Sequence, residues 1–189
     1  MRVFVAAEVP EDIRSGLSRI QTALSDLGLR QLRWVESSKI HLTLRFCGEM
    51  APEATQRLST ALSDPAPVAA FRVRLERLQF LPPRGSPRVL VLSLAESDPL
   101  QRLAGWIDRA AQAVGVEKEE RPYRPHLTLG RFRSGGRSPH HLRPAEFPKD
   151  MAGMEFLIEG FQILQSRLGA GGPSYTVLGE FSLPAGGSA

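Results

Sequence analysis

Several short segments are rich in β-branched and aromatic residues, a composition typical of β-strands. The clearest alternation of apolar and polar positions is in 71–77, where Phe71, Val73 and Leu75 share one side and arginines occupy the other. A glycine-rich turn at residues 168–173 joins the last two predicted strands. The predicted strands cover residues 2–7, 40–46, 71–77, 88–94, 126–132, 156–165 and 174–183.

Three other segments have apolar residues at steps of three and four, which predicts amphipathic helices. They cover residues 13–27, 51–62 and 97–115. The apolar stripe of the first consists of Ile13, Leu17, Ile20, Leu24 and Leu27. Local signals agree: Gly28 ends the first helix, Pro52 stands near the start of the second, and Asp98 is a candidate cap of the third.

The same order of predicted elements occurs twice along the chain. The tetrapeptide HLTL begins at His41 and again at His126, each time inside a predicted strand. His41 follows Arg2, where the first strand opens, by 39 residues, and His126 follows Arg88, where the matching strand opens, by 38. This agreement predicts an internal duplication within one two-lobed domain that spans residues 1–189.

The repeated strand has one apolar face and one polar face, because alternate side chains of a strand point to opposite sides. The leucines can fill a core. A duplicated core strand would explain them, but it would not explain a polar face in both copies. Two strands related by a two-fold axis can bring equivalent faces together, so His41, Thr43, His126 and Thr128 are predicted to line one site.

Two histidines at one site suit acid–base chemistry at phosphorus. The imidazole pKa lies close to neutrality, so one ring of a pair can act as general base while the other acts as general acid. In-line displacement needs a proton removed on one side of the phosphate and delivered on the other. The threonine hydroxyls can hydrogen-bond the non-bridging phosphate oxygens.

Metal binding by the two histidines is the competing chemistry. The chain has no H-E-x-x-H motif and no third ligand at a recognisable spacing. It also has no G-K-[ST] loop of the kind that holds nucleoside triphosphates. Neither a metal nor another cofactor is expected.

Charge and cysteine content narrow the setting. The net charge is +4, which fits a polyanionic partner such as RNA and equally fits an ordinary basic surface. Cys47 is the only cysteine, which excludes an intramolecular disulfide and favours a reducing, cytoplasmic location. No apolar stretch reaches the length of a membrane span, so no membrane partner is expected.

The chain resembles the 2H phosphoesterase superfamily, which is defined by two H-x-[ST]-x motifs. Within it, the chain is similar to the RNA 2′,3′-cyclic phosphodiesterases, also called 2′-5′ RNA ligases. The similarity extends nearly end to end, over "MRVFVAAEVP", "RWVESSKIHLTLRFCGE", "RPYRPHLTLGRF", "LQSRL" and "GPSYTVL".

The resemblance implies a two-lobed, duplicated α+β fold with two antiparallel sheets flanking a central cleft and helices on the outer faces. It implies hydrolysis of RNA 2′,3′-cyclic phosphate ends to 2′-phosphate, and in some members reversible 2′-5′ ligation without ATP. His41 resembles the proton donor to the leaving O3′, and His126 the proton acceptor that activates water. Phe46 resembles a base-stacking aromatic and Arg131 a phosphate-binding arginine.

One implied role conflicts with the strand pattern. Five residues along a regular strand is the opposite face, so Arg131 should point away from His126, while Arg45 should point with His41 and is a further substrate-binding candidate. Arg131 reaches the site only if the strand bulges near Gly130. Tyr123 is a candidate for the mouth of the site, with a core role as the alternative.

His140 and His141 lie in a proline- and arginine-rich connection that is expected to be a solvated loop. The principal interpretation is therefore a metal-independent RNA 2′,3′-cyclic phosphodiesterase, acting as a monomer on RNA ends. The alternatives are a phosphodiesterase of 2′-5′-linked oligonucleotides or of small cyclic phosphates, and a non-catalytic RNA-end binding module.

Overall fold

The fold of the chain comes from a computed structural model that describes residues 1–29, 32–83, 86–132, 153–169 and 172–186. His140 and His141 lie outside the described residues. The elements in chain order are β1 (Arg2–Glu8), α1 (Glu11–Asp26), β2 (Leu32–Trp34), the 3₁₀ helix η1 (Ser37–Lys39), β3 (His41–Glu49), α2 (Pro52–Ala61), β4 (Phe71–Leu81), β5 (Val89–Leu94), α3 (Asp98–Ala113), β6 (His126–Phe132), β7 (Glu155–Ile158), β8 (Gly160–Gly169) and β9 (Gly172–Ser182). All the predicted helices and strands are present, except that the single strand predicted over 156–165 is two strands, β7 and β8, which pair with β4 and β1. The short β2 and η1 were not predicted.

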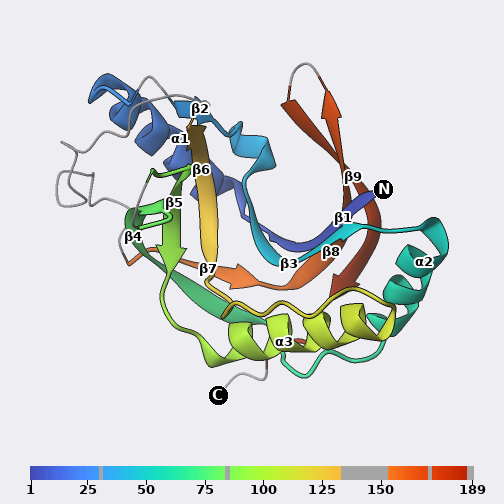
Figure 1. The fold of residues 1–189 in the computed structure, drawn as a ribbon. Coiled ribbons are helices and arrows are strands. Elements are labelled where there is room, and N and C mark those ends of the chain that lie inside the picture. The colour runs from blue at the N-terminus through green and yellow to red at the C-terminus, as the bar shows by residue number, and fades with distance from the viewer. Residues whose placement is uncertain (30–31, 84–85, 133–152, 170–171, 187–189) are drawn as a thin grey trace.

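The described strands form one antiparallel path in the order β7-β4-β5-β6-β3-β1-β8-β9, with β2 paired to β6 beside it (Figure 1). The expected α+β class is therefore confirmed, but the expectation of two separate sheets is wrong. The two halves of the sheet are joined where β3 meets β6, through the antiparallel pair Leu42 and Leu127. Both leucines are fully buried, so the join is part of the core.

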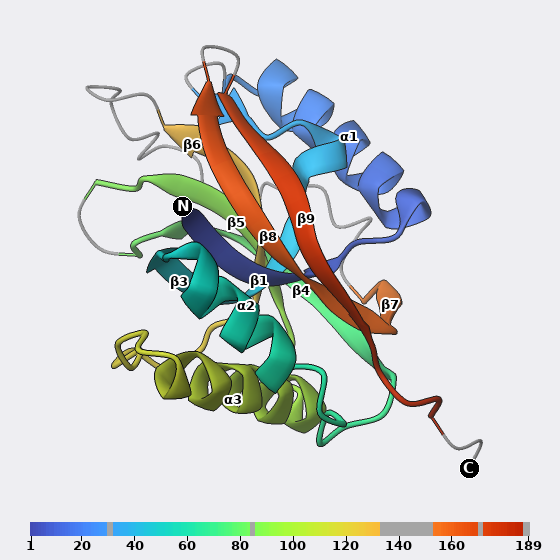
Figure 2. The same cartoon turned by 90° about the vertical axis from the view of Figure 1, so that its right-hand side faces the viewer.

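The three helices bury their apolar sides in one continuous core with one face of the sheet. Leu17 of α1, Leu58 of α2 and Leu103 of α3 belong to this core, together with Val3 and Val5 of β1. Figures 1 and 2 show the helices on the outer side of the curved sheet, with the long β8–β9 hairpin forming the end of the sheet beside β1. Among the described residues, no helix covers the opposite face of the central strands.

Two details at the helix ends differ from the sequence prediction. Leu27 follows the last turn of α1 and is 53% exposed, so it does not belong to the buried stripe. The cap of α3 is Ser97, whose hydroxyl accepts a hydrogen bond from the Leu100 N–H at 3.4 Å, and Asp98 is the first helical residue. A serine hydroxyl satisfies one of the otherwise unpaired amides of the first turn.

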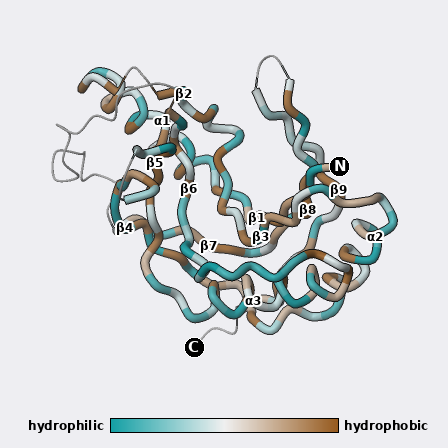
Figure 3. Tube along the Cα trace, viewed as in Figure 1, coloured by the Kyte–Doolittle hydropathy of each residue, from teal (hydrophilic) through white to brown (hydrophobic). Residues whose placement is uncertain are grey.

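A polar connection returns from the end of α3 to the start of β6. This segment, residues 114–125, passes along α3 and is coloured as hydrophilic over most of its length (Figures 1 and 3). It delivers the chain to His126, so its anchoring determines where the second HLTL strand begins. No helix among the described residues is long and apolar enough to cross a membrane.

Candidate active site

The two HLTL motifs meet at the centre of the sheet. Because Leu42 pairs with Leu127 in antiparallel register, one residue further in each direction sets His41 opposite Thr128 and Thr43 opposite His126. Directly opposed residues of an antiparallel pair share a face, so these four side chains form one block on the uncovered face. The two histidines lie diagonally across it, where Cα atoms are typically about 7–8 Å apart. The predicted approach of the two motifs is thus present.

Both imidazoles are held by the same backbone interaction. Nδ1 of His41 lies 2.8 Å from the Lys39 carbonyl oxygen, and Nδ1 of His126 lies 2.7 Å from the Arg124 carbonyl oxygen. A carbonyl only accepts hydrogen bonds, so each Nδ1 must carry the proton. Each Nε2 is then the nitrogen that can take up or release a proton, as a catalytic acid or base requires.

The environment of His41 disfavours its charged form. Burial lowers its pKa below the ordinary value of 6.5, and the nearby positive charges of Arg131 and His126 lower it further, while the hydrogen bond to the Lys39 carbonyl partly offsets them. The influence of Arg131 and His126 shows that both side chains lie near His41. Two groups from the second half of the chain therefore act on a histidine of the first.

Thr43 and Thr128 are half-buried on the same face as the histidines. Within the part of the chain that the structure describes, neither hydroxyl hydrogen-bonds to a protein group. A half-buried hydroxyl without a protein partner is free to bind a ligand oxygen. Both threonines are thus available for the phosphate contacts that the sequence predicts.

A β-bulge in β6 turns Arg131 onto the site face. Leu90 pairs with Gly130 and Val91 with Thr128, so Leu129 is an extra residue on β6. Leu129 and Gly130 are consecutively buried, and Arg131 is exposed. The bulge that Arg131 needs is present at the expected place. A methyl group on Gly130 would lie 3.2 Å from Trp34 Cε3, so a glycine lets Trp34 pack closely there.

Gln21 of α1 supports this bulge, and the sequence analysis did not single it out. Its side-chain amide donates hydrogen bonds to the Leu129 carbonyl at 2.9 Å and to the Val35 carbonyl at 2.7 Å. Gln21 is buried, so these bonds are shielded from water. A polar residue within the apolar stripe of the predicted helix was the available signal.

The first motif contains the same bulge at the equivalent position, which the sequence analysis did not predict. Val5 pairs with Arg45 and Ala6 with Thr43, so Leu44 is the extra residue of β3. Phe46 consequently shares the face of His41 and is 61% exposed. A base-stacking role for Phe46 is sterically open, because the ring has a free surface on that face.

The expectation that Arg45 points with His41 is wrong. The bulge turns Arg45 to the core face, where its side chain is 8% exposed. Its Nε lies 2.7 Å from Asp108 Oδ1 of α3, and its guanidinium also donates to the Glu117 carbonyl. Arg45 therefore fastens β3 to α3 and to the connection that leads to His126, and it does not face the site.

Comparison with known proteins identifies the family of this chain. Residues 9–148 match the family model described as the 2′-5′ RNA ligase superfamily. An RNA 2′,3′-cyclic phosphodiesterase of Thermus thermophilus is 33% identical over 191 residues, covering 97% of this chain and 90% of that protein. One of Archaeoglobus fulgidus is 30% identical over 181 residues, covering 96% and 99%.

The chain belongs to the 2′-5′ RNA ligase superfamily.

Two solved structures share the fold of this chain. The crystal structure of TT0787 of Thermus thermophilus superposes with a TM-score of 0.80 at 31% identity, covering 98% of this chain and 99% of that one. The apo form of LigT from E. coli superposes with a TM-score of 0.75 at 24% identity, covering 97% of each chain.

In this superfamily member, Tyr123 has the core role that was the alternative for it. Its ring packs against the core, and its hydroxyl donates to the Thr43 carbonyl at 3.0 Å. Burial raises the pKa of the phenol, so the hydroxyl stays protonated as a donor. Tyr123 therefore ties the connection before β6 to the first motif.

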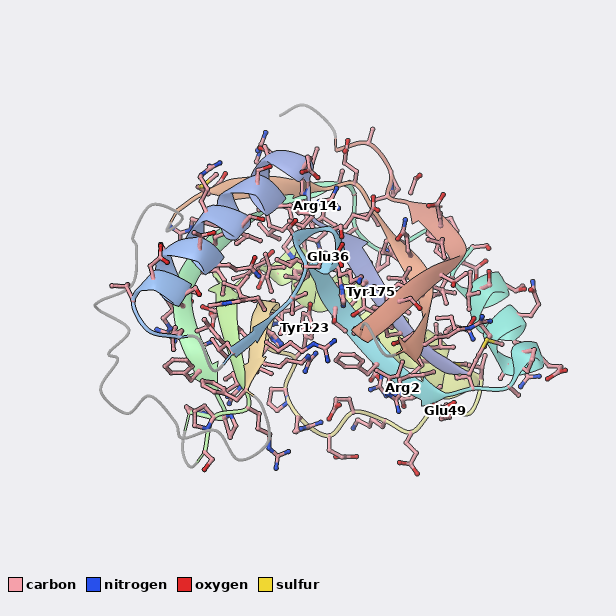
Figure 4. All side chains as sticks on the ribbon, turned by 90° about the horizontal axis from the view of Figure 1, so that it is seen from above. Arg2, Arg14, Glu36, Glu49, Tyr123 and Tyr175 are labelled. Atoms are coloured by element: carbon pink, nitrogen blue, oxygen red, sulfur yellow. The ribbon has the colours of Figure 1, made fainter. Side chains whose placement is uncertain are left out.

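Tyr175 and Phe4 complete the site face, and neither was singled out as a site residue. The His41 ring lies 4.9 Å from Phe4 and 5.3 Å from Tyr175, centroid to centroid, with an edge contact to Tyr175. Tyr175 belongs to β9, and Figure 4 shows it near the middle of the molecule, as it shows Tyr123. The motif "GPSYTVL" contains Tyr175, but nothing local in it indicates contact with His41.

No cluster of three or more His, Cys, Asp or Glu side chains that could hold a metal ion occurs among the described residues. The groups that the site offers are two imidazoles, two threonine hydroxyls, one arginine and an aromatic surface. Together they can bind an anion and exchange protons with it on two sides.

Proposed function

We propose that this protein hydrolyses RNA 2′,3′-cyclic phosphate ends to 2′-phosphates by two-histidine general acid–base catalysis, without a metal. The observation that carries the proposal is the matched pair of Nδ1–carbonyl hydrogen bonds, which leaves an Nε2 from each motif on one face. The relatives named RNA 2′,3′-cyclic phosphodiesterase support the choice of substrate.

In the proposed reaction, neutral His126 takes a proton from water through Nε2. The water oxygen attacks phosphorus, a new P–O bond forms, and the bond from phosphorus to O3′ breaks. Protonated His41 donates its proton to O3′, so the products are a 2′-phosphate and a free 3′-hydroxyl. The attacking and leaving oxygens lie on opposite sides of the phosphorus, which suits two histidines on a diagonal.

The remaining site groups stabilise the phosphate. The hydroxyls of Thr43 and Thr128 have no protein partner among the described residues, so they can donate to non-bridging oxygens. Arg131 lies close enough to His41 to lower its pKa, and its guanidinium can neutralise charge on the same phosphate. The exposed Phe46 ring can stack on the terminal base.

The binding of a phosphate also increases the fraction of His41 that carries the proton to be donated. Burial and positive neighbours lower its pKa in the free protein, so the ring is mainly neutral there at neutral pH. A phosphate anion beside it stabilises the protonated form. The bound substrate thus favours the protonated form of His41, which its own leaving oxygen requires.

A phosphodiesterase of 2′-5′-linked oligonucleotides is the second candidate, because that bond carries the same adjacent 2′ and 3′ oxygens and the family model bears the name of the 2′-5′ RNA ligases. The same ring opening, with a 5′-hydroxyl of RNA attacking phosphorus in place of water while the bond from phosphorus to O3′ breaks, would form such a linkage. Both reactions need the same acid and base.

The test is incubation of the chain with an oligonucleotide that ends in a 2′,3′-cyclic phosphate, in the presence and absence of a chelator. The expected product is a 2′-phosphate, formed at the same rate in both. Loss of turnover on chelation would indicate a metal enzyme. Binding without turnover would indicate a non-catalytic RNA-end module, and cleavage of only a 2′-5′-linked oligonucleotide would favour the second candidate.

We infer that residues 1–189 form a single two-lobed domain derived by internal duplication. The helices α1 and α3 both have 16 residues, and each precedes a strand that begins with HLTL, although β2 and η1 lie between α1 and β3. The bulge falls on the fourth residue of each motif, Leu44 and Leu129. Equal placement of an irregularity supports common ancestry better than regular structure does.

We also infer that the protein acts as a monomer in the cytoplasm. All the groups that the reaction needs come from one chain. Cys47 is buried as a free thiol, and burial raises its pKa to about 11, which keeps it protonated and unreactive. Sedimentation of the purified chain, with and without RNA, tests the oligomeric state.

A further inference from the structure

Two arginines stand opposite each other beside the candidate active site. Arg33 of β2 pairs with Arg131 of β6 in antiparallel register, so their side chains share a face. Both are exposed, while the flanking Leu32 and Gly130 are buried. That shared face is the face of His126 and Thr128, since the bulge brings Arg131 onto it.

Neither guanidinium is neutralised by a carboxylate within the described ranges of the chain, where the cations of the printed ion pairs are Met1, Arg2, Arg14, Lys39, Arg45 and Arg121. Like charges directly opposite each other on a sheet destabilise it. An arrangement of this kind is relieved when an anion binds between the two guanidinium groups.

The Arg33 side chain reaches across to the β8–β9 hairpin. A methyl group built on Gly172 would lie 2.5 Å from Arg33 Nη2, so the guanidinium touches the backbone at the start of β9. Arg131 acts on Tyr175, three residues further along β9, because its positive charge lowers the pKa of that phenol against the larger raising effect of burial. The two arginines therefore extend towards β9 at two successive positions, Arg33 at Gly172 and Arg131 near Tyr175.

The part of this face that holds Arg33 lies beyond the position of the reacting phosphate. Arg131 follows Thr128 by three residues, which is at most about 10 Å along a strand at about 3.3 Å per residue. Arg33 is level with Arg131 on the neighbouring strand, and its head group lies against Gly172, three residues before the Tyr175 that contacts His41. A phosphate held by the two histidines would thus leave Arg33 free for another one.

We propose that Arg33 binds the phosphodiester next to the reacting cyclic phosphate, with Arg131 between the two phosphates. The site then selects RNA chains over cyclic mononucleotides, because only a chain has that second phosphate. A planar guanidinium donates two hydrogen bonds to one phosphate, so a pair of arginines suits a backbone phosphodiester. This proposal rests on the proposed function, since it concerns the same site.

The experiment compares two substrates, an oligonucleotide with a 2′,3′-cyclic phosphate end and a 2′,3′-cyclic mononucleotide. In Arg33→Ala, kcat/KM for the oligonucleotide should fall about 10-fold more than kcat/KM for the mononucleotide, through a higher KM. Arg33→Lys should recover only part of the loss, since a lysine restores the positive charge but not the planar guanidinium that donates two hydrogen bonds to one phosphate. Arg102→Ala is the matched control, because Arg102 is an exposed arginine of α3 on the helical side of the sheet.

Salt dependence adds a second readout that a merely structural role would not change. Loss of one phosphate contact should make the slope of log KM against log salt shallower by about 0.7 for a single-stranded substrate. Equal losses on both substrates, no loss on either, or an unchanged salt slope would overturn the proposal.

Failure of the proposed function would be distinguishable. In that case the wild-type chain would hydrolyse neither substrate. Binding of an unreactive oligonucleotide with a 3′-phosphate end, followed by fluorescence anisotropy, would then decide the role of Arg33. Weaker binding by Arg33→Ala than by Arg102→Ala would support the subsite, and equal binding would overturn it.

Discussion

Arg45 Nε lies 2.7 Å from Asp108 Oδ1, on the face of β3 opposite to His41. This ion pair joins the first HLTL strand to α3. The same guanidinium donates a hydrogen bond to the Glu117 carbonyl, in the connection that leads to the second HLTL strand. Removing one partner of a buried pair leaves the other charge desolvated and unpaired. The pair therefore stabilises the contact between the two halves of the chain.

Arg45→Met should lower the free energy of unfolding by about 3 kcal/mol, measured by urea denaturation, because Asp108 loses its partner. KM for RNA should stay unchanged at a temperature where the variant is folded. Arg57→Met, an exposed arginine on α2, is the matched control and should change stability by less than about 0.5 kcal/mol. A raised KM with unchanged stability would show that Arg45 contributes to substrate binding.

Gln21→Leu should both destabilise the fold and weaken RNA binding. The substitution leaves the part-buried Val35 carbonyl without its amide donor and removes one donor from the buried Leu129 carbonyl, at a cost of about 1–3 kcal/mol. Because Leu129 is the bulged residue that sets the direction of Arg131, KM for RNA should rise as well. The matched control is the exposed Gln56→Leu on α2. A stability loss with an unchanged KM would show that the bulge holds without Gln21.

His41→Ala and His126→Ala should each lower turnover by about 10²–10⁴, the usual contribution of a positioned acid or base. The double variant should lose less than the product of both effects, because the pair acts as a unit. A phosphodiester with an aryl leaving group needs little protonation, so it should rescue His41→Ala more than His126→Ala. If the aryl substrate rescued only His126→Ala, His126 would be the acid and His41 the base, and the two-histidine mechanism would still hold.

Stability should fall as the solution is acidified below about pH 6.5, in part through His41. Burial lowers the pKa of its imidazole in the folded chain, so the unfolded chain binds the proton more readily. The unfolded state is thus stabilised by protonation at pH values below the ordinary pKa of histidine, and above it this effect is absent. The slope from one such proton is at most about 1.4 kcal/mol per pH unit.

The check is chemical denaturation between pH 5 and pH 8, compared for the wild type and His41→Gln. The variant should show a shallower loss of stability on the acid side, whatever its absolute stability. Parallel curves would mean that His41 binds protons equally well in both states, in conflict with its burial.

The sequence by itself was sufficient for the local elements and for the chemistry of the two motifs. The apolar periodicities of residues 97–115 and 126–132 match α3 and β6, because each depends only on neighbouring residues and on which side of the element is buried. Alternation within HLTL correctly separated the core leucines from the histidine and threonine face, since that is a property of any strand.

The tertiary structure alone decided which flanking side chains accompany the histidines. Arg45 and Arg131 follow the motifs at similar distances, yet one faces the core and the other the site. Both orientations are the reverse of what strict alternation predicts, because each strand has a bulge, a mismatch in hydrogen bonding with a strand remote in sequence, β1 for Leu44 and β5 for Leu129. Gly130 hinted at one bulge, but no residue type marked the other.

Contacts across long sequence separations were likewise beyond local reasoning. Tyr175 meets His41, and Arg33 meets Gly172, only because β8 and β9 fold back beside β1. The continuity of the sheet depends on a single pair, Leu42 and Leu127, between two strands 85 residues apart. Pairing of this kind depends on how the whole core packs, since the strands have the same apolar pattern whether they join one sheet or two.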